Sequence, residues 1–228
     1  MKMNNIKHIF FDLDHTLWDF ERNSALAFVE IFKKNKIDIG VEDFLQSYIP
    51  VNNFYWKKYR DNLVTKEELR FGRLNDTFNE LRLKVSHDQI NNLAEDYILH
   101  LPNNNYLFED AISTLKFLQQ KYILHVITNG FSEVQNLKLQ NSNIARFFTT
   151  VTTSEEVGVK KPHPQIFEFA LQKASAIPEH SLMIGDNLEA DILGAENFGI
   201  TAILYDEQLT KDYNGQKIKK LKQLIELL

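Results

Sequence analysis

Two carboxylates near the N-terminus are the first residues whose type and spacing could carry chemistry. Asp12 directly follows the apolar residues 9–11, and Asp14 comes two positions later. On an extended segment, residues two apart project to the same side, where two carboxylates repel each other unless a cation or a proton lies between them. The pair therefore indicates a catalytic or metal-binding site, although an acidic turn that only caps the next helix is the commoner use of Asp-x-Asp.

A hydroxyl group and backbone donors follow the apolar run of residues 122–127. The segment Thr128-Asn129-Gly130 precedes a predicted helix, for which Ser132 and Gln135 form a capping box. A hydroxyl, free backbone N–H groups and a helix N-terminus together make an anion-binding site. Thr, Asn and Gly are also frequent in strand-to-helix turns, where they form local hydrogen bonds, so this segment alone does not identify a site.

A lysine and two further carboxylates occur in the second half of the chain. Lys161 precedes Pro162 on a loop before a helix predicted to start near Pro164, and the two prolines keep that loop out of helix. Asp186 follows a predicted buried strand, and Asp191 lies in the next helix, where the macrodipole alone would favour it. A single loop lysine is usually just solvated. Whether these groups form a site therefore depends on where the fold places them.

Short apolar runs separated by helical stretches predict the elements that position these residues. The predicted strands cover residues 6–11, 122–127, 147–151, 182–184 and 201–205. Strands that alternate with helices form βαβ units, which right-handed crossovers join into a doubly wound parallel sheet, an α/β fold. Ligands of such sheets bind beyond the carboxyl ends of the strands. We therefore expect the candidate residues to meet at one edge of the sheet.

Residues 25–101 show helical patterning without a convincing buried strand. Capping boxes mark two helix starts there, Thr65 with Glu68 and Ser86 with Gln89. A small helical bundle inserted after the first strand accounts for this pattern. The predicted division is a Rossmann-like core of residues 1–18 and 101–228 and a helical cap of residues 19–100.

Composition narrows the class of protein. With 228 residues, 43% of them apolar, the chain suits one core plus an insertion. A net charge of −5, with clustered lysines only on an amphipathic helix predicted over residues 217–225, gives no reason to expect a nucleic-acid partner. The absence of cysteine excludes disulfides, thiolate catalysis and Cys-based zinc sites. The apolar run 9–11 is too short for a signal peptide or a membrane span, so we expect a cytoplasmic protein with no membrane partner.

The groups at the strand ends are those that phosphoryl transfer requires. Carboxylates such as Asp12 and Asp186 are ligands that Mg²⁺ prefers, together with water and substrate phosphate. Thr128 and Lys161 would neutralise the phosphoryl oxygens as charge builds up in the transition state. The residues therefore predict a Mg²⁺-dependent enzyme that acts on a small phosphorylated metabolite.

These residues resemble the four motifs of the haloacid dehalogenase-like hydrolase superfamily over almost the whole chain. The motifs are, in order, Asp12-x-Asp14-x-Thr16, Thr128, Lys161-Pro162, and Gly185-Asp186 with Asp191. The resemblance implies a phosphatase in which Asp12 attacks phosphorus and forms an aspartyl phosphate, while Asp14 is the general acid and base.

The same resemblance implies how the metal and the phosphate are held. The Asp12 carboxylate, the Asp14 backbone carbonyl and Asp186 would bind Mg²⁺. Asp191 would hold these ligands in place or bind the metal through a water molecule. Thr128 and Lys161 would act in catalysis. The residues expected to contact substrate are Thr16, Asn129 and Gly130.

In finer detail, the chain resembles bacterial pyrimidine 5′-nucleotidases, a branch described as house-cleaning for noncanonical nucleotides. The segments 127–131, 154–159 and 51–53 carry this resemblance. It implies that the cap selects the substrate, with Asn52 and Asn53 as candidates for hydrogen bonds to a base. The aromatic residues between 54 and 59 could stack on a base, although large aromatics more often form the core of a bundle.

Two other functions stay open. One is a phosphatase or a mutase that acts on small sugar phosphates, although the mutase branch usually has Gly-Val where this chain has His15-Thr16. Asp14 argues against true dehalogenases, which lack a carboxylic acid at that position. The second is a phosphoacceptor signalling domain, but such domains are about half as long and are phosphorylated after a later strand. The oligomeric state, monomer or dimer, is not predicted.

Overall fold

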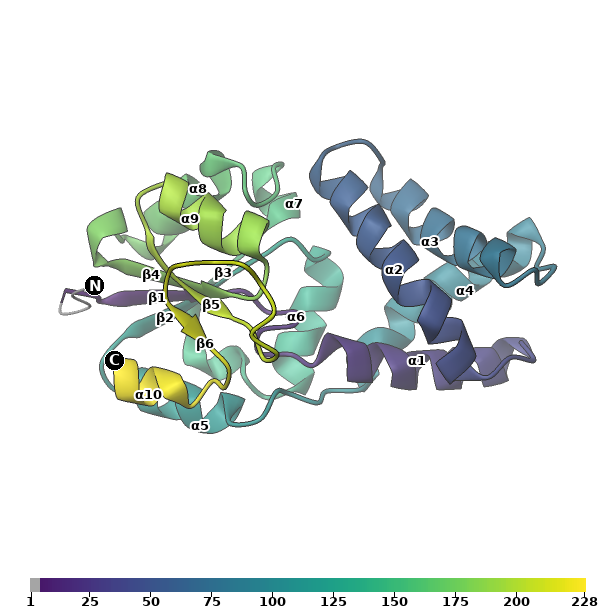
Figure 1. Cartoon of the computed structure of the whole chain (residues 1–228), viewed down its shortest axis with the longest axis horizontal. Helices are drawn as coiled ribbons and strands as arrows, with labels where there is room; N and C mark the ends of the chain where they lie inside the picture. Colours follow the sequence, from purple (N-terminus) through teal and green to yellow (C-terminus); the bar gives the residue numbers. More distant parts are fainter. Residues whose placement is uncertain (1–4) are drawn as a thin grey trace. The chain divides into compact units, whose positions relative to one another are not determined.

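The computed structural model describes residues 5–228, and residues 1–4 lie outside the described part (Figure 1). The chain forms two compact units. The sheet unit contains the chain up to Phe20 and Asn105–Leu228, and the helical unit is Glu21–Asn104. For comparison, the sequence predicts a helical insertion of residues 19–100.

The sheet unit is built on a six-stranded sheet in which every neighbouring pair is parallel. The strand order is β3-β2-β1-β4-β5-β6. The strands are β1 (His8–Phe11), β2 (Ile123–Thr128), β3 (Phe148–Thr153), β4 (Ser181–Gly185), β5 (Thr201–Tyr205) and β6 (Lys217–Ile218). The order reverses at β1, which pairs with β2 on one side and with β4 on the other.

Helices cover both faces of this sheet, with α8 and α9 on one side and α5 and α10 on the other (Figure 1). Ile166 and Phe167 of α8 pack with Phe10 of β1 and Met183 of β4 in one buried cluster. The helices of this unit are α5 (Ala111–Leu118), α6 (Ser132–Asn141), α7 (Ser154–Val157), α8 (Pro164–Ala174), α9 (Gly194–Asn197) and α10 (Gln223–Leu227). A π-helical segment, Leu188–Leu193, precedes α9. The predicted doubly wound α/β sheet is thus confirmed.

The C-terminal stretch differs from its prediction. Lys217 and Ile218, assigned from their spacing to an amphipathic helix, instead form β6 beside β5. Only Gln223–Leu227 is helical there. A two-residue edge strand is too short to show alternation, and its flanking lysines and leucines fall at helical spacing by chance.

The helical unit contains α1 (Phe20–Asn35, whose first residue belongs to the sheet unit), α2 (Val41–Arg60), α3 (Lys66–Glu80) and α4 (His87–His100). Both predicted capping boxes are present, at the start of α3 and of α4. Phe28 lies at the centre of the core, with its ring centroid 4.7 Å from those of Phe44, Tyr48 and Tyr97. Aromatic packing therefore holds the bundle together.

A buried histidine pair in the sheet makes the stability depend on pH. His125 Nε2 lies 3.1 Å from His8 Nδ1, and His125 Nδ1 lies 2.8 Å from the hydroxyl of Thr150. Burial, with a smaller effect of the His8 charge, lowers the pKa of His125 from 6.5 to about 4. Between these values the unfolded chain binds a proton that the folded chain does not, so the free energy of unfolding must fall as the pH falls.

We expect this loss to amount to roughly 1–2 kcal/mol between pH 7 and pH 4, about half of the full linkage value because partial solvation screens the imidazolium. Urea unfolding of the protein and of His125→Gln, carried out between pH 7 and pH 4, measures this loss of unfolding free energy. Glutamine keeps the polar contacts but does not titrate, so the variant should lose less stability on acidification. Equal losses in the two proteins would show that other groups cause the pH dependence.

Candidate active site

The point where the strand order reverses brings two of the predicted carboxylates together. Asp12 follows β1 and Asp186 follows β4, and these strands are neighbours with Phe11 opposite Ile184. The backbone N–H of Asp12 donates to the Ile184 carbonyl, at 2.9 Å. Crevices at such switch points are where open α/β sheets bind their ligands.

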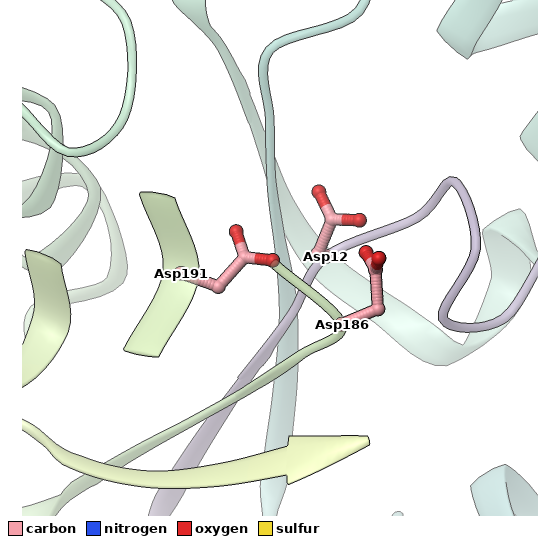
Figure 2. A group of neighbouring side chains, drawn as sticks. All are labelled: Asp12, Asp186 and Asp191. Atoms are coloured by element: carbon pink, nitrogen blue, oxygen red, sulfur yellow. The ribbon is translucent and has the colours of Figure 1, made fainter. Parts of the chain in front are cut away.

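A third carboxylate completes an acidic cluster at this edge. Asp12, Asp186 and Asp191 each offer an oxygen, and these oxygens all lie within 4.8 Å of one another. Figure 2 shows the three side chains converging from the β1 end, the β4 end and the π-helical segment. The Asp191 carboxylate is held in place by the backbone N–H of Asn187, at 3.0 Å.

Lys161 is the cation of this cluster. Its Nζ lies 2.6 Å from Asp12 Oδ1, 2.7 Å from Asp191 Oδ1 and 2.6 Å from the Ile127 carbonyl. The side chain is buried, whereas the neighbouring Lys160 is half-buried. Lys161 is therefore the lysine of the pair that meets the carboxylates.

Thr128 and Asn129, at the end of β2, form hydrogen bonds that order the neighbouring part of the site. The amide of Asn129 binds the Lys161 backbone on both sides, donating to its carbonyl at 3.0 Å and accepting from its N–H at 2.8 Å. Thr128 Oγ1 accepts hydrogen bonds from the N–H of Gly130, at 3.1 Å, and from Gln135 Nε2, at 2.7 Å. Because both acceptor positions of the hydroxyl are used, its own hydrogen remains to be donated to an oxygen in the site.

Asp14 points to helix α6 and not into the acidic cluster. Its Oδ1 lies 2.6 Å from Lys138 Nζ, and its Oδ2 accepts from Gln135 Nε2 at 2.9 Å. Gln135 was expected to cap α6 with Ser132, and this was wrong, since the N-cap residue is Phe131 and has no side-chain cap. Sequence reasoning missed Lys138 altogether and gave Gln135 no role in the site.

The remaining predicted substrate residue of the sheet unit is Thr16. It is fully buried, and its hydroxyl has no hydrogen-bond partner within residues 5–228. A buried hydroxyl without a partner is costly unless something else satisfies it.

The two predicted substrate residues of the helical unit differ in exposure. Asn52 is buried, and its Oδ1 accepts hydrogen bonds from Arg73 Nη1, at 3.0 Å, and from the Tyr48 hydroxyl, at 3.3 Å. Asn53 is exposed. Asn52 thus orders a buried polar cluster within its own unit, and its role in substrate binding stays a prediction.

Burial first, and then the crowding of like charges, set the pKa values in the cluster. Burial raises the pKa of Asp12 well above its usual value, and the Asp191 and Asp186 carboxylates add to the rise against the opposing effect of Lys161. Burial also raises the pKa of Asp186, with a contribution from Asp191. Burial alone would lower the pKa of Lys161, but the Asp12 and Asp191 charges outweigh it, so the net shift is upward and the ammonium is retained.

This donor set fits a divalent cation. The three carboxylates carry more negative charge than Lys161 neutralises. Lys211 donates to the Asp186 backbone carbonyl, and its Nζ lies 3.6 Å from Asp186 Oδ2. A cation among the carboxylates would offset the repulsion that adds to the effect of burial on the pKa of Asp12. Hard oxygen ligands of this kind favour Mg²⁺ over softer metals.

Gly185 gives a direct test of the cluster. A Cβ at this position would lie 2.4 Å from Asp191 Oδ2, and Lys161 and the Asn187 N–H prevent that carboxylate from moving freely. We expect Gly185→Ala to weaken Mg²⁺ binding about 10- to 100-fold, as measured by titration calorimetry. Gly40→Ala, in the helical unit, is the matched control. Unchanged affinity in Gly185→Ala would show that Asp191 does not act on the metal.

A parallel sheet with an acidic cluster, a buried lysine and a hydroxyl donor at its switch point defines an α/β enzyme of the phosphoryl-transfer type. The family model for haloacid dehalogenase-like hydrolases matches residues 6–199, and the chain belongs to this family. It is therefore an enzyme, a phosphatase of that family, and the predicted resemblance is confirmed.

Individual relatives differ in the substrates that their names state. The chain is 35% identical to the pyrimidine 5′-nucleotidase YjjG of Escherichia coli, over 84% of this chain and 82% of the relative. It is 32% identical to a glyceraldehyde 3-phosphate phosphatase of Methanothermobacter thermautotrophicus, over 90% and 88% of the two chains. The magnesium-bound crystal structure of the putative hydrolase YfnB from Bacillus subtilis superposes with a TM-score of 0.90 at 26% identity, covering 99% of each chain. Within the described residues, no helix has the length and apolar character of a membrane span.

Proposed function

We propose that this phosphatase is a Mg²⁺-dependent 5′-nucleotidase that hydrolyses pyrimidine nucleoside monophosphates through an aspartyl phosphate on Asp12. The observation that carries the mechanism is the placement of Asp12, with Lys161 2.6 Å from Oδ1 and two carboxylates beside it, at the switch point of the sheet. The similarity to a named pyrimidine 5′-nucleotidase supports the substrate class. The cytoplasm remains the proposed location.

In the first proposed step, a carboxylate oxygen of Asp12 forms a bond to phosphorus while the bond from phosphorus to the ester oxygen breaks. Asp14 donates its proton to that oxygen, which leaves as an alcohol. Thr128 donates its hydrogen to a phosphoryl oxygen, and Lys161 holds Asp12 in position and offsets the negative charge.

In the second step, Asp14 takes a proton from water as the water oxygen bonds to phosphorus and the bond to Asp12 breaks. Inorganic phosphate leaves, and both aspartates return to their starting states. Mg²⁺ bound by Asp12, Asp186 and the Asp14 backbone carbonyl, with support from Asp191, would supply a Lewis acid that neutralises phosphoryl charge.

The helical unit is proposed as the cap that selects the leaving group. Asn52 and Asn53 remain the candidate residues for hydrogen bonds to the base. Phe54 is 55% exposed and is the most exposed of the neighbouring aromatics, with Lys58 Nζ 4.3 Å from its ring centroid. Tyr59 is buried in the bundle.

Phosphate release from a panel of nucleoside monophosphates and sugar phosphates tests the proposal. We expect the highest kcat/KM with uridine or deoxythymidine 5′-monophosphate, and loss of activity on chelation with EDTA that added Mg²⁺ restores. A preference for hexose or triose phosphates, or isomerisation without release of phosphate, would contradict the nucleotidase assignment. The similarity to a glyceraldehyde 3-phosphate phosphatase makes a small sugar-phosphate phosphatase the second candidate.

A further inference from the structure

A buried lysine and a buried glutamine on α6 hold the side chain of Asp14, and the mechanism above gives neither of them a role. Gln135 and Lys138 are three residues apart on α6, so they share one face of the helix. Both are almost completely buried, with 0% and 2% of their surface exposed. A lysine that is buried to this degree needs an acceptor for its ammonium hydrogens, and Asp14 Oδ1 supplies one.

The two residues bind the two oxygens of Asp14 separately. Lys138 lies 2.6 Å from Oδ1 and Gln135 lies 2.9 Å from Oδ2, so the plane of the carboxylate is fixed. Asp14 is 124 positions from Lys138 in the sequence, and such a contact is specific to the folded state. If Asp14 only formed a local turn or capped the next helix, its side chain would need no partner so far away in the sequence.

The lysine is itself held in a defined position. Its Nζ lies 4.2 Å from the centroid of the Trp18 ring and 5.2 Å from that of Phe20. Trp18 lies in the loop between β1 and α1 and is completely buried. Aromatic faces attract an ammonium group most strongly where water is excluded, so the rings keep the Lys138 charge next to Asp14.

Gln135 also connects Asp14 with the phosphate side of the site. The same Nε2 that lies 2.9 Å from Asp14 donates to Thr128 Oγ1 at 2.7 Å. A Cβ on Gly130 would come within 2.4 Å of this glutamine amide, so the turn after β2 leaves room for it. One amide thus sets the positions of the proposed proton carrier and of the hydroxyl that would donate to the phosphoryl oxygen.

We propose that Lys138 and Gln135 are positioning residues that orient Asp14 for proton transfer to the leaving oxygen, an inference that rests on the proposed function. When Asp14 gives its proton to the ester oxygen it becomes a carboxylate. Lys138 and Gln135 already point at its two oxygens and receive the new charge without rearrangement. Their effect must therefore be largest for leaving groups that need a proton.

Two phosphate esters of similar size separate this role from a merely structural one. The 4-nitrophenolate of 4-nitrophenyl phosphate departs without a proton, whereas the alkoxide of benzyl phosphate requires one. The kcat/KM value reports the steps up to phosphorylation of Asp12. Its ratio for the two esters, measured on one preparation, does not depend on the fraction of folded enzyme.

We expect Lys138→Met to lower kcat/KM about 10- to 100-fold for benzyl phosphate and by no more than about threefold for 4-nitrophenyl phosphate. Gln135→Met should shift the ratio in the same direction and serves if Lys138→Met does not fold. Asp14→Asn gives the full effect for comparison, roughly 10²- to 10⁴-fold on benzyl phosphate. The exposed Lys116→Met on α5 is the matched control.

The inference would be overturned if Asp14→Asn showed the dependence on the leaving group but Lys138→Met and Gln135→Met did not. In that case the two α6 variants would lose activity equally on both esters, or on neither. The proposed function would fail differently. In that case the unmodified enzyme would cleave neither ester, or Asp14→Asn would show no dependence on the leaving group, and the inference would fall with it.

Discussion

Asp12→Asn is expected to reduce phosphatase turnover by on the order of 10⁴- to 10⁶-fold, the scale of losses seen when a covalent nucleophile is removed. The amide retains the shape of the carboxylate and can still accept from Lys161. It cannot form an aspartyl phosphate at a useful rate. Phosphate release measures the loss of turnover, and a single-turnover assay for labelled phosphoenzyme measures the loss of the aspartyl phosphate.

The same variant should fold at least as stably as the parent protein. Burial, with the neighbouring carboxylates, raises the pKa of Asp12, so ionising this group costs more free energy in the folded chain than in the unfolded chain. Asparagine carries no charge, and the difference in unfolding free energy should move in favour of the variant as the pH rises above 4. Lys161 keeps its contact with Asp191 at 2.7 Å.

Asp88→Asn, on an exposed side chain at the start of α4, is the matched control and should leave activity unchanged. Substantial residual activity in Asp12→Asn, without a labelled phosphoenzyme in the parent protein, would indicate direct attack by water. A loss of activity together with a large fall in the melting temperature would mean that the residue is needed for folding, and the nucleophile assignment would lose its support.

The sheet and the residues at its carboxyl edge were predictable because both depend on local patterns. Buried parallel strands read as short apolar runs, and the residue after each run falls at the ligand edge. Asp12, Thr128 and Asp186 follow directly from this rule. The adjacency of Asp12 and Asp186 needs one further fact, the strand order, which places β1 next to β4.

The contacts of Asp14 could not be predicted in the same way. Lys138 and Gln135 lie on a helix whose polar residues suggest a solvated face, yet they are buried together with the apolar Val134 and Leu139. Only the fold shows that this face meets the loop after β1. The available signal was the spacing of Gln135 and Lys138, 7 and 10 positions after Thr128, which puts both on one side of the helix that follows the site.

Lys161→Met is expected to combine a large loss of activity with a large loss of stability. Lys161 makes three contacts of 2.6–2.7 Å with Asp12, Asp191 and the Ile127 carbonyl. Removing one partner of a buried ion pair leaves uncompensated charge and costs about 3–5 kcal/mol. Activity should fall on the order of 10³-fold, because the charge that positions Asp12 and offsets the phosphoryl oxygens is gone.

Magnesium should reverse part of the stability loss but little of the activity loss. Without the ammonium group the three carboxylates are more negative, so they should bind a divalent cation more tightly, and binding to the folded state alone raises the free energy of unfolding. Urea unfolding of Lys161→Met at increasing Mg²⁺ concentration, with Lys160→Met as the neighbouring control, measures this. If Lys160→Met were the inactive variant, or if Lys161→Met were as stable as the parent protein without Mg²⁺, the ion pairs of Lys161 would not hold the site together.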